Sequence, residues 1–216
     1  MKDLSQIAEI IEAEINNTSY LKDPENLYSP IEYTMEFGGK RIRPILLLIS
    51  YQLFNDNIER AFSPAKAIEI FHNFTLLHDD IMDKAPLRRG KITVHKKWNN
   101  NIAILSGDVM MIHAYQLLTQ VESKYLKTIL NIFNKAAIEV CEGQQWDMDF
   151  ESTDDVLLID YMKMIEFKTA VLLAASLKIG AVLADANDKD QNHLYEFGLN
   201  MGIAFQLKDD LLDVFG

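Results

Sequence analysis

The sequence predicts an all-α protein, and three observations support this prediction. Apolar residues recur at intervals of three and four, as in Leu4, Ile7, Ile11 and Ile15, which is the period of an amphipathic helix. A sustained alternation of apolar and polar residues, which would indicate a strand, is hard to find. Residue types that favour helix starts precede several of the apolar stretches.

The predicted helix starts depend on proline, on small hydroxyl residues and on acidic first turns. Pro44 opens one helix, and Ser63 is a candidate N-cap before a proline at the first helical position. Thr153 precedes two aspartates, which the helix dipole favours in a first turn. The expected helices lie near residues 4–17, 30–38, 44–54, 64–83, 102–121, 124–145, 154–164, 167–184 and 190–215.

Residues 84–98 interrupt the helical period, because they contain Pro86 and Gly90 and concentrate positive charge. We expect a basic loop here. No repeat, low-complexity tract or linker composition divides the rest of the sequence. The prediction is therefore a single domain over residues 1–216.

The composition limits the possible partners and compartments. The chain has 21 Lys plus Arg against 32 Asp plus Glu, a formal net charge of -11, and such a surface repels nucleic acid and anionic membranes. No apolar stretch is long enough to span a bilayer. Cys141 is the only cysteine, which excludes an intramolecular disulfide, and the N-terminus lacks the apolar run of a secretory signal. We expect a cytoplasmic protein.

Two aspartate clusters share the spacing Asp-Asp-x-x-Asp, and each follows an apolar helical stretch. They are Asp79, Asp80 and Asp83, and Asp209, Asp210 and Asp213. Like charges four residues apart on a helix cost about 0.2–0.5 kcal/mol per pair, so stability does not favour the pattern. Binding of Mg²⁺ would favour the pattern, because this ion takes one or two carboxylates and completes its coordination shell with water and substrate phosphates. The alternative for either cluster alone is a solvated charged turn, and the presence of two favours the metal.

Two cationic segments are candidate phosphate sites. Lys40, Arg41 and Arg43 follow two glycines just ahead of a predicted helix, whose first N–H groups also attract anions; the alternative is a solvated helix start. Arg88 and Arg89 follow the first acidic cluster, and arginine can bind phosphate oxygens bidentately. Together the acidic and cationic clusters predict a metal-chelated diphosphate and a second diphosphate that is held directly.

The predicted helix before the first acidic cluster is strongly apolar, with Ile70, Phe71, Phe74, Leu76 and Leu77. Ordinary core packing explains most such stretches. The alternative is a tunnel for an apolar tail. An amphiphile with a diphosphate head and a hydrocarbon tail would match both the charged clusters and the tunnel.

These motifs resemble those of the trans-isoprenyl diphosphate synthases, the polyprenyl synthetase family, from about residue 30 to the last residue. The segment 77–83 with Arg88-Arg89-Gly90 is similar to the family's first aspartate-rich motif, 39–44 to its N-terminal signature and 205–213 to its second aspartate-rich motif. Shorter motifs of the family, which lie between its two aspartate-rich motifs, are matched by Gly107-Asp108, Gly143-Gln144 with Asp147, and Lys168-Thr169. The resemblance implies an isoprenoid-synthase helical bundle around a central apolar cavity. Relatives continue beyond the second motif, so we expect this chain, which ends at Gly216, to lack their C-terminal helices.

The resemblance also implies roles for individual residues and a homodimer. The carboxylates of Asp79, Asp83 and Asp209 would bind Mg²⁺, three ions in the family, and Asp80, Asp210 and Asp213 belong to the same carboxylate sets. The allylic diphosphate would contact Arg88, Lys168 and Lys208. Isopentenyl diphosphate would contact Lys40, Arg43, His72 and Arg89, although His72 alone would be interpreted as a core histidine. Thr169 and Gln206 would lie near the reacting carbons.

The implied reaction is the trans, head-to-tail (1'-4) condensation of isopentenyl diphosphate with an allylic diphosphate. Phe74 lies five residues before Asp79, Phe71 nearly a turn deeper, and the small Thr75 one residue closer. This pattern resembles the geranylgeranyl type, so we expect a C20 product, with the C15 farnesyl product second. Two different functions stay open: a non-catalytic regulatory subunit, which typically lacks an acidic motif, and a class I terpene cyclase, whose second motif normally differs.

Overall fold

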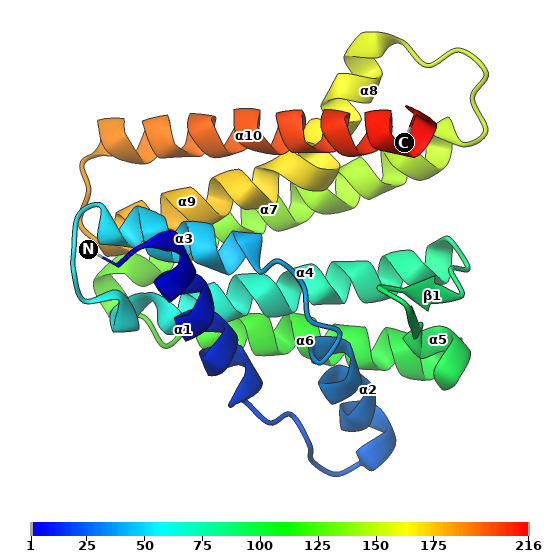
Figure 1. Ribbon diagram of the computed structural model, residues 1–216, viewed down its shortest axis with the longest axis horizontal. Helices are drawn as coiled ribbons and strands as arrows, with labels where there is room; N and C mark the ends of the chain where they lie inside the picture. Colours follow the sequence, from blue (N-terminus) through cyan, green and yellow to red (C-terminus); the bar gives the residue numbers. More distant parts are fainter. Residues whose placement is uncertain (1, 216) are drawn as a thin grey trace. The chain divides into compact units, whose positions relative to one another are not determined.

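The computed structural model describes residues 2–215, and helices occupy most of them, which confirms the predicted all-α class (Figure 1). The α-helices are α1 (Leu4–Asn16), α2 (Glu25–Met35), α3 (Ile42–Gln52), α4 (Phe62–Met82), α5 (Val94–Lys97), α6 (Asn100–Leu118), α7 (Ser123–Phe150), α8 (Leu158–Ile165), α9 (Val171–Leu183) and α10 (Asp188–Phe215). The remaining elements are a 3₁₀ turn, η1 (Ile58–Ala61), a π-helical turn, η2 (Glu166–Ala170), and the strands β1 (Leu87–Arg88) and β2 (Lys91–Ile92).

The described residues form two compact units. The N-terminal unit contains Lys2–Ile45 and Phe62–Val121, and the C-terminal unit contains Leu46–Ala61 and Glu122–Gly216. Each unit has its own packed helices and carries one of the two aspartate clusters. That both units belong to one domain stays a prediction.

In the N-terminal unit, α4 and α6 lie side by side (Figure 1). α1 packs against α4, and α2 and α5 each pack against both α4 and α6. Gly107 allows the close approach of α6, because a Cβ atom at this position would lie 2.3 Å from Nε2 of His78. This contact fixes the end of α4 that carries the first aspartate cluster.

In the C-terminal unit, α9 is the central helix. It is buried at every position except Lys178, as expected for a helix that is hydrophobic all round, and it packs against α7 and α10. Gly143 lets α7 approach η2, because a Cβ atom there would lie 2.3 Å from the backbone nitrogen of Lys168. The position of Lys168 therefore depends on a backbone contact.

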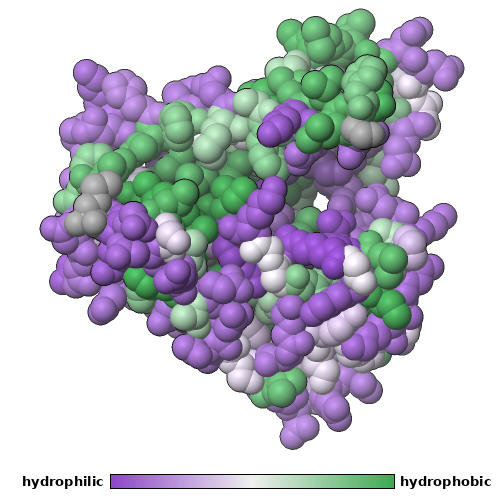
Figure 2. Space-filling model, in the orientation of Figure 1, coloured by the Kyte–Doolittle hydropathy of each residue, from purple (hydrophilic) through white to green (hydrophobic). Residues whose placement is uncertain are grey.

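Large apolar side chains are exposed at several places in the C-terminal unit, among them α8 and the end of α10. Leu158 and Ile159 of α8 are 73% and 75% exposed, and Val214 and Phe215 at the end of α10 are 72% and 80% exposed. Figure 2 shows hydrophobic residues gathered over α8. These parts of α8 and α10 therefore belong to the surface of the unit rather than to its core.

The second helix begins earlier than the sequence predicted. α2 starts at Glu25, five residues before the predicted start, and Pro30 lies inside the helix. A proline there removes one helical hydrogen bond, but Pro30 and the adjacent Ile31 are buried, and this burial offsets the loss. The helix ends before residue 38, because Gly38 and Gly39 have φ angles of 68° and 146°, outside the helical region.

The predicted N-cap Ser63 and the helix start predicted after Thr153 are both wrong, because the two hydroxyl groups bind elsewhere. Ser63 lies inside α4, and its Oγ donates to the carbonyl of Leu117 at 2.8 Å. Thr153 Oγ1 donates to the carbonyl of Asp149 at 2.9 Å and so helps to end α7, which extends to Phe150. The helix predicted from residue 154 begins only at Leu158.

The basic segment 84–98 contains a small β-hairpin that the sequence analysis missed. Leu87 pairs with Ile92 and Arg88 with Lys91. The two connecting residues, Arg89 and Gly90, have φ angles of 51° and 77°, as a two-residue hairpin turn of type I′ requires. The hairpin therefore places Arg88 in a strand and Arg89 in the turn.

Candidate active site

The first aspartate cluster lies at the C-terminal end of α4 and is bridged by an arginine from the hairpin. Arg88 donates through Nε to Oδ1 of Asp80 at 2.7 Å and through Nη2 to Oδ2 of Asp79 at 3.3 Å. Asp80 is buried, and burial raises the pKa of its carboxyl despite the opposing effect of Arg88. Asp83 follows one turn after Asp79, whose carbonyl accepts from its backbone N–H at 2.9 Å. The first aspartate cluster thus combines carboxylates with Arg88, a cation that could bind a phosphate in place of these carboxylates.

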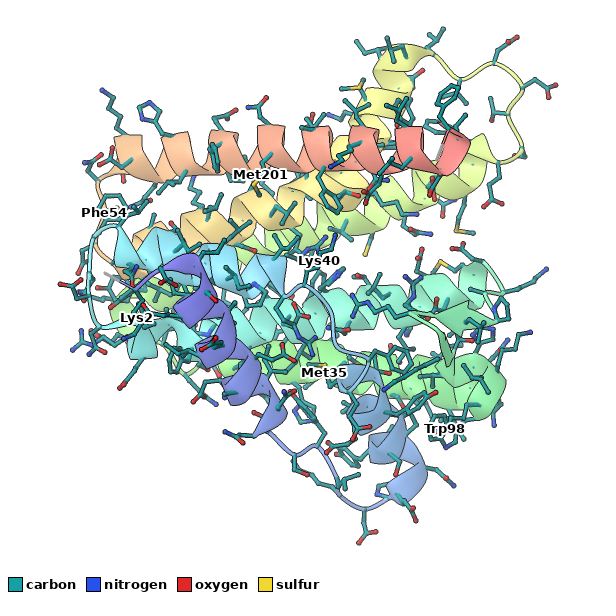
Figure 3. The ribbon with its side chains drawn as sticks, in the orientation of Figure 1. Lys2, Met35, Lys40, Phe54, Trp98 and Met201 are labelled. Atoms are coloured by element: carbon teal, nitrogen blue, oxygen red, sulfur yellow. The ribbon has the colours of Figure 1, made fainter. Side chains whose placement is uncertain are left out.

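The hairpin is held in place by contacts with α2. Trp98, labelled in Figure 3, meets the ring of Tyr33 edge-on, with ring centroids 5.4 Å apart. Tyr33 donates to the carbonyl of Ile92 at 2.9 Å, and Lys91 donates to the carbonyl of Glu36 at 3.0 Å. These contacts limit the positions that the two hairpin arginines can take.

The cationic cluster of the N-terminal unit brings together three of the residues predicted to bind isopentenyl diphosphate. Nη1 of Arg43 lies 3.1 Å from Nε2 of His72. Arg89 donates to the carbonyl of Gly38, and its guanidinium fills the space where a Cβ atom at Gly39 would lie. Lys40, the fourth predicted residue, is exposed in the connection between α2 and α3 (Figure 3).

The electrostatics of this cluster suit an anion. Burial, together with Arg89, lowers the pKa of Arg43 to about 10 against the opposing effect of Glu69. Burial, followed by the charges of Arg43 and Arg89, holds the pKa of His72 well below its usual value. A guanidinium can only donate, so His72 accepts through Nε2 and is neutral, with its proton on Nδ1.

The lowered pKa of His72 predicts a pH-dependent stability. The unfolded chain binds more protons than the folded chain below about pH 6.5, the ordinary histidine pKa. The stability contributed by neutral His72 is therefore complete above that pH and is lost as the pH falls toward the lower pKa of the folded state. We expect His72→Gln to reduce the fall in melting temperature between about pH 7 and 5.5. An equal fall in both proteins, or an equal effect of His193→Gln at an exposed position, would contradict this.

The apolar stretch before the first cluster is largely buried. Phe71 and Phe74 are 1% and 9% exposed, their ring centroids are 5.6 Å apart, and Phe74 also meets His78 at 4.7 Å. Thr75 donates to the carbonyl of His72 at 2.8 Å. A cavity of 10 Å³, enough for about one water molecule, is lined by Thr34, Phe37, Asn73, Leu76, Leu77, Asp80, Arg88, Arg89 and Val94.

The second aspartate cluster belongs to a hydrogen-bonded chain within the C-terminal unit. Thr169 donates to Oε1 of Gln206 at 2.8 Å, and Nε2 of Gln206 donates to Oδ1 of Asp210 at 2.8 Å. Tyr161 of α8 donates to Oδ2 of Asp210. Burial and the neighbouring Asp210 raise the pKa of Tyr161 to about 12, so the phenol stays protonated.

Lys168 and Thr169 both lie in η2, and Lys168 donates to Oδ2 of Asp147 at 2.5 Å. Tyr161 was not among the residues predicted from the sequence, although it precedes Lys168 by seven residues and so lies about two helical turns before it. Asp209 is partly buried, and Lys208 and Asp213 are exposed. Of the predicted residues in this unit, the structure therefore connects Thr169, Gln206 and Asp210 directly.

The carboxylates fit Mg²⁺ by their chemistry. Among residues 2–215, no group of three or more His, Cys, Asp or Glu side chains is arranged to hold a metal ion. Mg²⁺ does not require such a group, because it usually takes one or two carboxylates and completes its octahedral shell with water and phosphate oxygens. Asp79 and Asp83 in the N-terminal unit, and Asp209 in the C-terminal unit, could supply such ligands.

The helical fold and the repeated aspartate cluster place the chain among the all-α proteins of the isoprenoid-synthase type. The family model of polyprenyl synthetase matches residues 24–216, and the chain belongs to this family. No helix among the described residues is both long enough and apolar enough to cross a membrane.

Two curated relatives and one solved structure illustrate the similarity. The geranylgeranyl diphosphate synthase of Methanosarcina mazei is 41% identical over 94% of this chain and 64% of its own length. That of Sulfolobus acidocaldarius is 45% identical over 90% of this chain and 60% of its own length. A crystal structure of geranylgeranyl pyrophosphate synthase, 46% identical, matches with a TM-score of 0.96 over 100% of this chain and 66% of that one. The chain thus spans under two thirds of the length of these relatives.

Proposed function

We propose that the protein is a Mg²⁺-dependent prenyltransferase that condenses isopentenyl diphosphate with an allylic diphosphate, most simply to the C20 product geranylgeranyl diphosphate. The observation that carries this proposal is the arrangement along α4. This helix carries His72 of the cationic cluster, the buried Phe71 and Phe74, and the first aspartate cluster. The names of the similar proteins support it. A homodimer belongs to the same proposal.

The chain's own residues would bind and orient the two substrates. Asp79, Asp83 and Asp209 are the proposed Mg²⁺ ligands, and the bound ions supply positive charge that stabilises the leaving diphosphate. Arg88, Lys168 and Lys208 would contact the allylic diphosphate, and Lys40, Arg43, His72 and Arg89 would contact isopentenyl diphosphate. Asp80, Asp210 and Asp213 would complete the two carboxylate sets.

The chemistry needs no dedicated protein base. The allylic carbon–oxygen bond breaks, the double bond of isopentenyl diphosphate attacks the allylic cation, and the departing diphosphate accepts the proton that is lost. The oxygen atoms of Thr169 and Gln206 would stabilise the developing positive charge. Apolar walls such as Phe74 would exclude water, which would otherwise capture the cation.

Phe74→Ala should lengthen the product beyond C20, because it removes an aromatic wall about 7.5 Å along α4 from Asp79, at 1.5 Å per residue. Thin-layer chromatography of radiolabelled products measures the chain length. The exposed Phe197→Ala is the control and should leave the product unchanged. An unchanged chain length for Phe74→Ala would refute the proposed role of Phe74.

The decisive test incubates the purified chain with Mg²⁺, isopentenyl diphosphate and each of the C5, C10 and C15 allylic diphosphates, and resolves the products by length. A C20 product supports the proposal, and a C15 product would instead assign the protein to the farnesyl type. A cyclic hydrocarbon from an allylic diphosphate alone would indicate a terpene cyclase. Binding of Mg²⁺ and diphosphate without any product would favour a non-catalytic subunit.

A further inference from the structure

Arg41 differs from the other cations of the segment 40–43. It is only 4% exposed, whereas Lys40 is exposed and Arg43 is partly buried. Its backbone is left-handed, with φ at 46°, a conformation that is unfavourable for a residue with a Cβ atom. A buried arginine with an unfavourable backbone requires strong compensating contacts.

All three guanidinium nitrogens of Arg41 supply those contacts, each with a different helix. Nε donates to Oε2 of Glu12 in α1 at 3.0 Å, Nη1 to Oε1 of Glu69 in α4 at 2.7 Å, and Nη2 to the carbonyl of Met35 at the end of α2 at 3.0 Å. Arg41 therefore joins α1, α2 and α4 immediately before α3 begins.

Glu69 is as buried as its partner. It is 2% exposed, and Nδ2 of Asn73 donates to Oε1 at 3.1 Å and to its backbone carbonyl at 2.8 Å. Burial alone would lower the pKa of Arg41, but Glu69 and Glu12 outweigh it and the net pKa is raised. Arg41 therefore stays charged, and its bond to Glu69 anchors it to α4 in a way that a mobile surface arginine would not be anchored.

The side chains next to Arg41 belong to the proposed subsite for isopentenyl diphosphate. Arg43 reaches His72, which lies one helical turn after Glu69 on α4. The same helix thus holds both the anchor of Arg41 and the partner of Arg43. We infer that Arg41 is a positioning residue that fixes the left-handed turn before α3 and so sets the places of Lys40 and Arg43 for isopentenyl diphosphate. This inference rests on the proposed function.

The test compares substrate binding with folding in two variants. Arg41→Lys keeps the charge opposite Glu69 but loses the fork that reaches three helices. The double variant Arg41→Gln/Glu69→Gln removes both buried charges together, and the only carboxylate that it leaves without its arginine is Glu12, whose side chain is 38% exposed. Arg60→Gln is the control, because Arg60 is exposed and its ion pair with Glu122, at 3.5 Å, lies at the surface.

Isothermal titration calorimetry measures the dissociation constants of isopentenyl diphosphate and of a Mg²⁺–allylic diphosphate, and circular dichroism measures the melting temperature. We expect both variants to bind isopentenyl diphosphate about tenfold to a hundredfold more weakly. Their dissociation constants for the allylic diphosphate should change less than about twofold, and so should both dissociation constants of the control Arg60→Gln. Unchanged isopentenyl diphosphate binding, or an equal loss for both ligands, would overturn the positioning role and leave the proposed function intact. Failure of the unmodified chain to bind isopentenyl diphosphate would instead refute the proposed function, and the inference with it.

Discussion

We expect Asp79→Asn to lower kcat for the proposed condensation by about three orders of magnitude, which corresponds to a loss of about 4 kcal/mol of transition-state stabilisation. The substitution keeps the size of the side chain and its ability to accept from Nη2 of Arg88. What it removes is the negative charge that would hold Mg²⁺ against the leaving diphosphate, and metal charge stabilisation amounts to several kcal/mol. Product formation at saturating concentrations of both substrates measures the effect.

Asp154→Asn is the matched control. Asp154 is exposed in the connection after α7, and its replacement should change kcat by less than about twofold, since surface substitutions away from special features usually have effects within about 0.5 kcal/mol. If Asp79→Asn retained a tenth or more of the kcat, roughly 1.4 kcal/mol or less would have been lost. Asp79 would then not be a metal ligand that catalysis requires.

Glu69→Ala should lower the free energy of unfolding by about 3 kcal/mol, because it removes the buried carboxylate of the ion pair and leaves Arg41 with only the half-exposed Glu12 as an ionic partner. Most folded domains have only about 5–15 kcal/mol of stability, so the loss is a large part of the total. Urea denaturation followed by circular dichroism at the helix band measures it.

Glu122→Ala provides the comparison for Glu69→Ala. Glu122 pairs with Arg60 at 3.5 Å, and the side chains are 56% and 63% exposed, so the expected loss is below about 1 kcal/mol. Equal losses in the two variants would mean that the Arg41–Glu69 pair behaves as a surface ion pair, and the inference about Arg41 would lose its physical basis.

The helices could be predicted from the sequence because apolar periodicity is a local property. α4, α6 and α9 lie within a few residues of their predicted positions. One error occurs where a side chain binds a distant part of the chain. Ser63, predicted to cap α4, instead binds the carbonyl of Leu117, which lies 54 residues away. The hairpin at residues 87–92 was missed because it depends on a two-residue turn rather than on an apolar pattern.

The chemistry of the candidate site could also be predicted in part. The aspartate clusters and the cationic residues were recognisable by type and spacing, and the pairing of Arg43 with His72 agrees with their expected common ligand. The separate role inferred for Arg41 could not be predicted, because the sequence does not show which arginine is buried and which is exposed. Only the contacts with Glu12, Glu69 and Met35 distinguish Arg41 from its neighbours.

The π-helical turn η2 joins α8 and α9 into one uninterrupted helical run from Leu158 to Leu183, and it gives this run an unusual tolerance to a change of length. A π turn closes hydrogen bonds between residues five apart and an α turn between residues four apart, so a π turn holds one residue more. Losing a single residue from η2 would therefore convert it into an ordinary α-helical turn, and Tyr161 would keep nearly its present rotation relative to α9. Lys168 and Thr169 lie within η2 itself, so the same deletion would move them directly. The extra residue of the wide turn thus sets the positions of Lys168 and Thr169 rather than the register of the helices on either side.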